Sequence, residues 1–239
     1  MKGTEKMSEI KTVGIIAALE VEVNLIKNSL LNKTTVKCAG TEIHTGKIGN
    51  TNVVLMQCGI GKVSAALGTQ AMISQFKPDC IINTGCAGGI AKGIKIGDIV
   101  LSTATAEWDM DTTVLGDPRG YIYSLGTSIV KSSDEIVSLT EKFVPSGVTV
   151  FKGLVASGDQ FVSSDDQRKI ILGSFPDALC AEMEGAAVGH VCAQNNVPFC
   201  VIRCMSDTAD GDSKVDYAEF SKKAGESSAK ILIDMFNTL

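Results

Sequence analysis

The sequence has few of the residues on which nucleic-acid binding and metal binding depend. Of its 239 residues, 22 are lysine or arginine and 27 are aspartate or glutamate, which gives a net charge of -5. No cluster of basic residues is present to neutralise the phosphates of a nucleic acid. Only two histidines occur, His44 and His190, and neither is spaced from a cysteine pair as zinc ligands are. We therefore expect no nucleic-acid partner, no bound metal and no cofactor.

The eight cysteines include no CxxC pair, and most of them lie in apolar runs that resemble strands. This pattern is typical of reduced, buried thiols in a cytoplasmic protein rather than of the disulfides of a secreted one. The sequence also lacks a secretory signal and any apolar run long enough to span a membrane. We therefore expect a cytoplasmic protein without a membrane partner.

Apolar, β-branched runs alternate with stretches of helical spacing along the chain. Strands are predicted at 12–19, 37–59 (an antiparallel pair with a Gly-Asn turn), 79–89, 95–108, 147–159, 177–184 and 197–207. Helices are predicted at 20–30, 61–76, 132–143, 164–175, 185–196 and 216–239. The alternation predicts a mainly parallel sheet with helices on both faces. Residues 1–10 are expected to form an N-terminal tail, and residues 11–239 a single α/β domain.

Polar groups follow nearly every predicted strand, at the edge where α/β sheets bind ligands. They comprise Glu20 and Glu22, then the segments "CGIGK", "TGCAGG", "SGDQFV", "AEMEG" and "RCMSD". Glu182 and Glu184 are unusual because they lie in an apolar run that contains no lysine or arginine. The alternation of a strand places both on one face, with Met183 opposite. We interpret these two acids as acceptors for the hydroxyl groups of a sugar.

Two short patterns resemble motifs but do not satisfy them. "CGIGKVS" lacks the spacing of a phosphate-binding loop, because position 56 is methionine and residue 63 is valine. "DTADGDS" (207–213) has acids without the spacing of a calcium loop, and a capped turn is the favoured interpretation.

With these strand ends identified, the sequence resembles the 5'-methylthioadenosine/S-adenosylhomocysteine nucleosidases of the purine nucleoside phosphorylase superfamily. The matching segments are "GIIAALEVEV", "CGIGKVSAALG", "KPDCIINTGCAGG", "GDIVLS", "SGDQFV", "AEMEGAAVGHVC" and "VPFCVIRCMSDTAD". The resemblance implies a three-layer α/β/α fold with a mixed central sheet. It also implies a homodimer that hydrolyses the bond between adenine and a 5'-thio-substituted ribose, with an adenine nucleoside as its small-molecule partner.

The resemblance also implies the site residues. Glu22 would activate the water, Asp207 would protonate adenine and Glu184 would bind ribose hydroxyls, as the three catalytic residues. Phe161 and Val162 would meet the base. The other substrate-binding positions are Ile60, Cys86, Ala87, Gly88, Thr112, Glu182, Met183, Arg203 (near Asp207), Ser206 and Tyr217.

The reaction itself requires groups of these kinds. Cleavage produces an oxocarbenium-like sugar and a poor leaving group, so the base needs a general acid and the attacking water a general base. Asp207 fits the first role if burial raises its pKa toward the working pH. Each acid also has a structural alternative. Glu22 could offset a helix dipole, Glu182 and Glu184 could bind amides at the next helix start, and Asp207 could cap a turn.

The chain departs from the family at two places. The family's "TGSAGG" serine, which helps to hold the attacking water, is Cys86 here, and a thiol is a poorer hydrogen-bonding group. The loop at 107–126 has Trp108 in place of a histidine and lacks the family's "GQ.PG" element. In the family this loop lies near the partner's site and helps to close the 5'-substituent pocket. Leu115, Tyr121 and Tyr123 could form an apolar wall there.

Two other functions remain open from the sequence. A phosphate-dependent nucleoside phosphorylase would need a phosphate site, usually built from arginines. Only Arg119, Arg168 and Arg203 exist; Arg203 has an assigned place and Arg168 is predicted on a polar, exposed helix, which leaves Arg119. A non-catalytic nucleoside-binding protein would be expected to lack Glu22 or Asp207. The hydrolase is favoured because its site residues are present, not only its fold.

Overall fold

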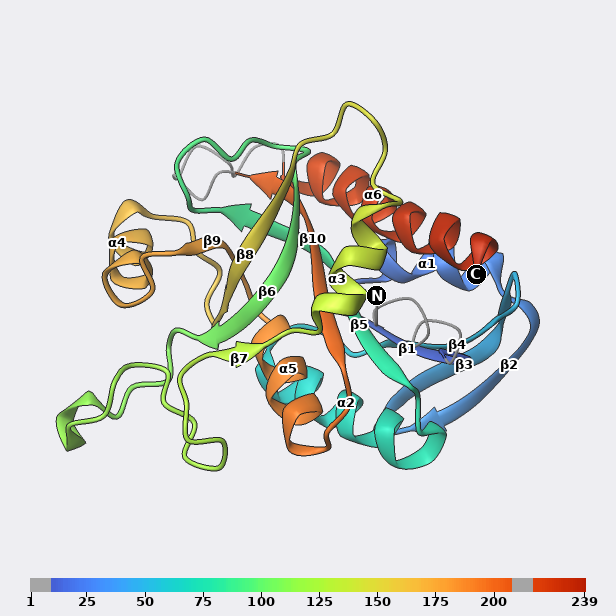
Figure 1. The fold of residues 1–239 in the computed structure, drawn as a ribbon, viewed down its shortest axis with the longest axis horizontal. Coiled ribbons are helices and arrows are strands. Elements are labelled where there is room, and N and C mark those ends of the chain that lie inside the picture. Colours follow the sequence, from blue (N-terminus) through green and yellow to red (C-terminus); the bar gives the residue numbers. More distant parts are fainter. Residues whose placement is uncertain (1–9, 208–216) are drawn as a thin grey trace, which may run out of the picture.

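The structure, a computed structural model, describes residues 10–207 and 217–239, with side chains described from residue 220 onward in the last segment (Figure 1). The expected N-terminal tail up to residue 9, the acids of "DTADGDS" beyond Asp207 and the side chain of Tyr217 lie outside the described residues. Within the described residues, no helix is both long and apolar enough to cross a membrane.

Ten strands form one sheet through the described part of the chain. They are β1 (Thr12–Ala17), β2 (Leu31–Cys38), β3 (Thr41–Ile48), β4 (Thr51–Gln57), β5 (Cys80–Gly89), β6 (Ile99–Glu107), β7 (Val130–Lys131), β8 (Val150–Ser157), β9 (Ala178–Glu182) and β10 (Phe199–Asp207). Their order is β10-β6-β8-β9-β5-β1-β4-β3-β2, and β7 pairs with β6. Because β10 also pairs with β5, the sheet curls back on itself at that end.

The sheet is mixed, as the family resemblance implies. β1 pairs in parallel with β4 and β5, β5 with β10, and β8 with β6 and β9. The antiparallel pairs are β2–β3, β3–β4, β5–β9, β6–β7 and β6–β10. The expectation of a mainly parallel sheet is therefore met only in part, because half of these strand pairs are antiparallel. No helix separates β2, β3 and β4, so short connections reverse the chain and give antiparallel neighbours there.

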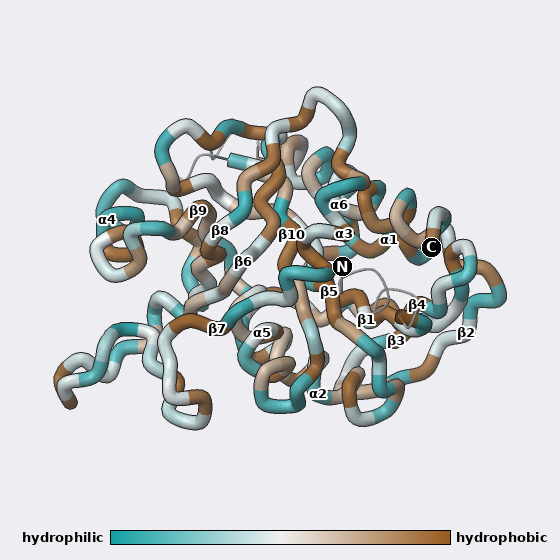
Figure 2. Tube along the Cα trace, in the orientation of Figure 1, coloured by the Kyte–Doolittle hydropathy of each residue, from teal (hydrophilic) through white to brown (hydrophobic). Residues whose placement is uncertain are grey.

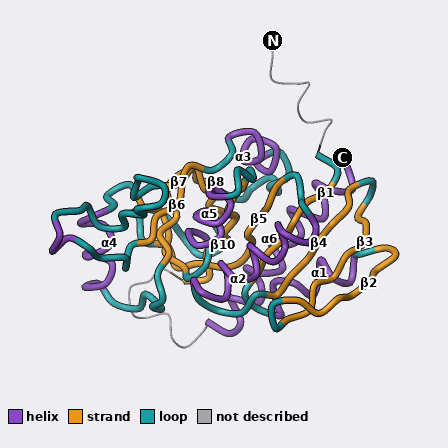
Figure 3. The backbone as a smooth tube through the Cα atoms, turned by 90° about the horizontal axis from the view of Figure 1, so that it is seen from below, coloured by secondary structure: helices purple, strands orange, loops and turns teal. Residues whose placement is uncertain are grey.

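Helices cover the sheet in two layers (Figures 1 and 3). The first layer contains α1 (Glu20–Ser29), α3 (Asp134–Glu141) and α6 (Tyr217–Thr238), and the second contains α2 (Lys62–Phe76) and α5 (Gly185–Gln194). α4 (Asp165–Ser174) lies at the opposite end of the molecule from β2 and β3. The short helix η2 (Thr113–Leu115) lies in the 107–126 loop, which projects from the body (Figure 1). The predicted helices agree with these elements to within a few residues.

Alternating side chains of the central strands pack against the two helical layers. In β10, Cys200, Ile202 and Cys204 join the cluster beneath α1, α3 and α6, whereas Val201 and Met205 join the cluster beneath α2 and α5. Both faces are therefore apolar, and Figure 2 shows hydrophobic residues concentrated along β5 and β10. Burial of each large aliphatic side chain stabilises the fold by about 1.5–3 kcal/mol. All eight cysteines are free and five are buried, which confirms the prediction of mostly buried thiols.

Candidate active site

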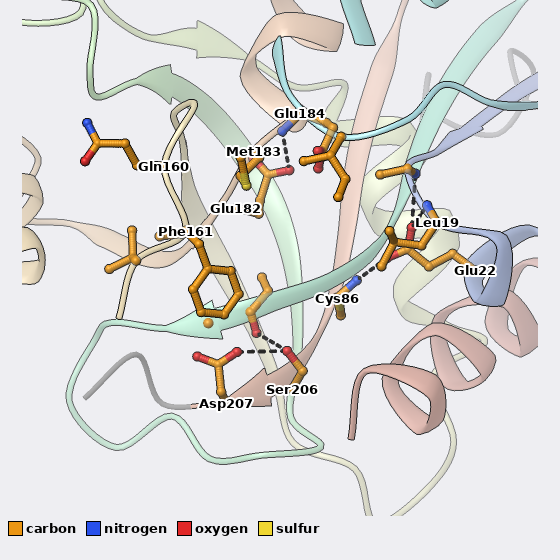
Figure 4. Close-up of a pocket in the computed structure, with 16 residues that line it drawn as sticks. Leu19, Glu22, Cys86, Gln160, Phe161, Glu182, Met183, Glu184, Ser206 and Asp207 are labelled. Carbon is orange, nitrogen blue, oxygen red and sulfur yellow. Dashed lines mark hydrogen bonds between the residues drawn. The ribbon is translucent and has the colours of Figure 1, made fainter. Parts of the chain in front are cut away.

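One pocket brings together nearly all of the predicted site residues (Figure 4). It is lined by Ala18, Leu19 and Glu22 at the start of α1, Ile60 before α2, Cys86–Gly88 in β5, Gln160–Val162 after β8, Ala181–Glu184 at the β9–α5 junction, and Ser206 and Asp207 in β10. The expected meeting of these segments at one edge of the sheet is therefore observed. Ala18, Leu19, Gln160 and Ala181 were not predicted, although each adjoins a predicted segment. Thr112 and Arg203 do not line this pocket.

Glu22 is anchored by three backbone amides. It lies in the first turn of α1 and is only 3% exposed. Its Oε2 accepts from the N–H groups of Ala18 (3.0 Å) and Leu19 (2.9 Å), and its Oε1 accepts from the N–H of Cys86 (3.0 Å). A Cβ at residue 85 would lie 2.6 Å from Oε1, so glycine there leaves room for the carboxylate in this position. Glu22 thus accepts hydrogen bonds from backbone amides at the start of α1, a structural role of the kind considered above, and it also faces the pocket.

Glu182 is engaged in a buried ion pair. Its Oε2 contacts Nη2 of Arg203, which is 1% exposed, and its Oε1 accepts from the hydroxyl of Ser157. The amides of Glu184 (3.0 Å) and Gly185 (2.8 Å) also donate to Oε2. The interpretation that both acids are reserved for sugar hydroxyls is therefore corrected for Glu182. Its bonds to amides at the helix start match the structural alternative, whereas its arginine partner was not predicted.

Arg203 contacts the acids of the β9–α5 junction and the buried strand β5. Its guanidinium donates to Asn83 as well as to Glu182, and lies 4.0 Å from Oε2 of Glu184. Burial alone would lower the pKa of Arg203, but the carboxylates of Glu182, Glu184 and Glu22 raise it above its ordinary value. Arg203 therefore stays charged and lies behind the carboxylates of the β9–α5 junction.

Glu184 lies at the N-cap position of α5, where the strand has already ended. β9 ends at Glu182, so the alternation of a strand does not extend to residues 183 and 184. Met183 lines the same pocket as the two acids, and the prediction that Met183 points to the opposite face is wrong. Oε1 of Glu184 accepts from the N–H of Gly61 at 2.9 Å. Burial, together with the charge of Glu182, raises the pKa of Glu184 to about 7, although Arg203 opposes the shift.

Asp207 ends β10 and is 2% exposed. The hydroxyl of Ser206 donates to its Oδ2 at 2.9 Å. Figure 4 shows Asp207 on the side of the pocket away from Glu22 and Cys86, with Phe161 also directed toward the pocket. Phe161 is half exposed (48%), and Val162 is buried behind it. The pocket therefore presents two buried carboxyl groups from opposite directions.

No lysine or arginine among the described residues lines the pocket. Arg119 pairs with Asp111 at 2.5 Å, and Nε of Arg168 donates to the carbonyl of Ile90 at 2.7 Å. The predicted helix of Arg168, α4, buries only Ile171, but the Arg168 guanidinium folds back onto the carbonyl of the residue that follows β5. With Arg203 bound to Glu182, all three arginines have partners, and none of the three lines the cavity.

The 107–126 loop contributes no residue to this pocket. Thr112 precedes η2, and the neighbouring Val114 and Leu115 are 92% and 72% exposed. Tyr121 and Tyr123 pack edge to face, with ring centroids 5.2 Å apart. The loop thus carries exposed apolar side chains outside the pocket of its own chain.

Replacing Arg203 with methionine is expected to lower the free energy of unfolding by about 3–5 kcal/mol, because Glu182 would remain buried without its counter-ion. Urea denaturation measures the change. Lys152→Met is the matched control, since Lys152 pairs with Glu141 at 2.8 Å on the surface and its loss should cost less than about 1 kcal/mol. Equal losses in the two variants would contradict a structural role for the buried pair.

The chain is similar to known proteins over nearly its whole length. The family model described as the phosphorylase superfamily matches residues 12–237. A curated 5'-methylthioadenosine/S-adenosylhomocysteine nucleosidase of Haemophilus influenzae (strain PittGG) is 39% identical over 228 residues, which cover 95% of this chain and 99% of that protein.

Two solved structures have the same fold. The nucleosidase of Neisseria meningitidis in complex with methylthio-immucillin-A has a TM-score of 0.92 and 36% identity, and the match covers 96% of this chain and 100% of that one. An aspartate-to-asparagine variant of the Helicobacter pylori enzyme, with 5'-methylthioadenosine in the active site, has a TM-score of 0.90 and 30% identity over 96% and 99% of the two chains. Since both the family model and the curated relative match nearly the whole chain, this protein belongs to the 5'-methylthioadenosine/S-adenosylhomocysteine nucleosidase family of the phosphorylase superfamily.

Proposed function

We propose that the protein hydrolyses the N-glycosidic bond of 5'-methylthioadenosine, S-adenosylhomocysteine and related 5'-substituted adenine nucleosides, releasing adenine and the thioribose. The observation that carries the proposal is the pair of buried carboxyl groups, Glu22 and Asp207, on opposite sides of one pocket. Inverting glycosidases use two separated carboxyl groups in this way, one to protonate the leaving group and one to activate water. Residues 11–239 would act as one domain.

The two carboxyl groups would divide the proton transfers between them. Asp207, next to Phe161 in the lining of the pocket, would protonate the departing adenine, while Phe161 stacks on the ring and Val162 offers backbone groups to its edge. Glu22 would accept a proton from the attacking water. Its three amide donors fix the carboxylate before substrate arrives, and such preorganisation lowers the cost of reaching the transition state.

Glu184 would bind the ribose hydroxyls. Glu182 would fix the β9–α5 junction, from which the Glu184 side chain extends into the pocket. Glu182 accepts the amides of Glu184 and Gly185, so it fixes the backbone from which Glu184 extends. Cys86 would stand beside the water through its position in β5, where its N–H already binds Glu22. Ala87, Gly88, Met183 and Ser206 would complete the wall around the sugar and base.

Water is favoured over phosphate as the nucleophile because no arginine or lysine of the described chain reaches the pocket. The test is mass analysis of the products formed from 5'-methylthioadenosine by purified protein, first without phosphate and then with it. Adenine and free methylthioribose in phosphate-free buffer are the expected products. A phosphorylated sugar that forms only when phosphate is present would identify a phosphorylase and direct attention to Arg119.

A homodimer would explain the exposed apolar side chains on α2 and in the 107–126 loop. Ile60, Val63 and Leu67 are 59%, 78% and 56% exposed on and before α2, and Leu115 is exposed in the 107–126 loop. Exposed apolar side chains at helical spacing on one helix are typical of interaction sites. We propose that the loop, including Thr112, lies near the partner's site and shapes its 5'-substituent pocket. The free thiols favour a cytoplasmic location.

The proposal predicts an acidic limb in the pH dependence of kcat/KM. Burial and the neighbouring Glu182 and Glu22 raise the pKa of Glu184 to about 7, against the effects of Arg203 and of the Gly61 N–H. Because the raised pKa keeps the proton on Glu184 up to near neutral pH, the ionised acceptor is lost as the pH falls through about 7. We therefore expect kcat/KM to fall below that pH, since this ratio reports the free enzyme. The limb should be absent in Glu184→Gln; an unchanged limb in that variant would contradict the assignment.

A further inference from the structure

A cluster of charged side chains lies beside the pocket, and the proposed reaction uses none of its members. Lys62 is the first residue of α2, and its side chain is only 16% exposed. Its Nζ lies 3.0 Å from Oε2 of Glu107 and 2.7 Å from Oδ1 of Asp109, whose side chains are similarly buried. The other oxygen of Glu107 lies 2.9 Å from Nδ1 of His190. Burying such charges is costly, so their arrangement requires an explanation beyond stability.

Asp109 is the residue that connects this cluster to two other segments. Its Oδ1 accepts from the ammonium of Lys62, and its Oδ2 accepts from the N–H of Asp159 at 2.7 Å. The carboxylate of Asp159 in turn accepts from the N–H of Lys62 at 2.8 Å. These contacts form a closed ring through the 107–126 loop, the start of α2 and the turn after β8.

The ring continues directly into the pocket through Gly61. The N–H of Gly61 donates to Oε1 of Glu184 at 2.9 Å, and Gly61 immediately precedes Lys62. Gly61 has φ +97°, and a Cβ there would lie 3.0 Å from Oδ1 of Asp159. The direction of its amide therefore depends on where Lys62 and Asp159 are held. Both residues are held by Asp109.

We propose that Asp109 is a positioning residue for ribose recognition, which acts through Lys62, Asp159 and the Gly61 amide to hold the carboxylate of Glu184. The inference rests on the proposed role of Glu184 in binding the sugar. Replacing Asp109 with asparagine tests the proposal, because both carboxylate oxygens of Asp109 accept hydrogen bonds. An amide group has one acceptor oxygen, so its NH2 would face either the Lys62 ammonium or the Asp159 N–H.

For Asp109→Asn we expect kcat/KM with 5'-methylthioadenosine to fall about tenfold to a hundredfold, the size that a small misplacement of a substrate-orienting group produces. The readout that separates positioning from general damage is the substrate. With the 2'-deoxy and 3'-deoxy analogues, the loss should shrink to less than about threefold for whichever analogue lacks the hydroxyl that Glu184 binds, because that contact no longer contributes. Losses of equal size on all three substrates would overturn the proposal.

Asp234→Asn is the matched control, since it makes the same carboxylate-to-amide change outside the 107–126 loop. Asp234 pairs with Lys230 at 3.0 Å on the exposed side of α6 and does not belong to the ring. We expect kcat/KM within about twofold of wild type, because surface pairs contribute little. A loss as large as that of Asp109→Asn would mean that the effect does not come from the ring and would overturn the proposal.

Two further measurements keep the inference testable whatever the catalytic outcome. Lys62→Met removes the ammonium and keeps its aliphatic stem, and combined with Asp109→Asn it should be strongly non-additive. Crystal structures of the Asp109→Asn and Asp234→Asn proteins need no substrate turnover: the hydrogen bond from the Gly61 N–H to Glu184 Oε1 should be broken in the first and kept in the second. A wild-type protein that releases no adenine would refute the proposed function, whereas an intact bond in Asp109→Asn would refute this inference alone.

Discussion

Replacing Asp207 with asparagine is expected to abolish adenine release while leaving nucleoside binding largely intact. The amide has nearly the shape of the carboxyl group and keeps an oxygen for the Ser206 hydroxyl, which donates to Oδ2 at 2.9 Å. It has no acidic proton to give to the departing base. General-acid catalysis contributes typically about a hundredfold to ten-thousandfold, and adenine is a poor leaving group, so the loss should lie at or beyond the upper end of that range.

Single-turnover release of adenine from 5'-methylthioadenosine measures the chemical step, and calorimetric titration of the same variant measures binding. Asp234→Asn is a suitable control, because Asp234 pairs with Lys230 at 3.0 Å on the exposed side of α6. It should keep wild-type rates. Wild-type turnover by Asp207→Asn would remove Asp207 from the mechanism, and a parallel loss of affinity would indicate a binding rather than a proton-transfer role.

The elements of the site were predictable because they follow local patterns. Apolar runs such as residues 12–19 and 197–207 define central strands, and the polar residues after them, including Glu22 and Asp207, fall at the ends of β1 and β10. The alternation of strands and helices predicts only that the carboxyl ends of the strands lie at one edge of the sheet. It does not predict which strands pair, so neither the antiparallel β5–β9 pair nor the β5–β10 pair that closes the sheet was predicted.

The junction at residues 182–184 shows why the rest was not predictable. Alternation placed Glu182 and Glu184 on one face, but β9 ends at Glu182 and α5 takes Glu184 as its N-cap. The buried partner of Glu182 is Arg203, which comes from β10 and lies 21 residues away in the sequence. A pairing between two strands that are not neighbours in the sheet depends on the three-dimensional fold, so no spacing within "LCAEMEGAAVGHVC" could reveal it.

Replacing Glu22 with glutamine is expected to slow hydrolysis of 5'-methylthioadenosine at least about a hundredfold, the usual size of a general-base effect. The glutamine amide is a much weaker base than a carboxylate. It also fits the anchoring poorly, because both oxygens of Glu22 accept from backbone amides and the new NH2 would face one of those donors. Single-turnover rates at several pH values measure the effect on the chemical step.

Glu20→Gln is the matched control, since Glu20 is the other acid in the first turn of α1 but is exposed and does not line the pocket. The comparison separates the two roles of Glu22. As a group that satisfies the amides at the helix start, Glu22 should contribute about 1 kcal/mol to stability, and its loss would lower the unfolding midpoint in urea. As the base that activates water, it should control the rate of the chemical step. If the Glu22→Gln protein loses stability but keeps the wild-type rate, Glu22 only stabilises the start of α1. Another residue would then have to act as the base that activates the water.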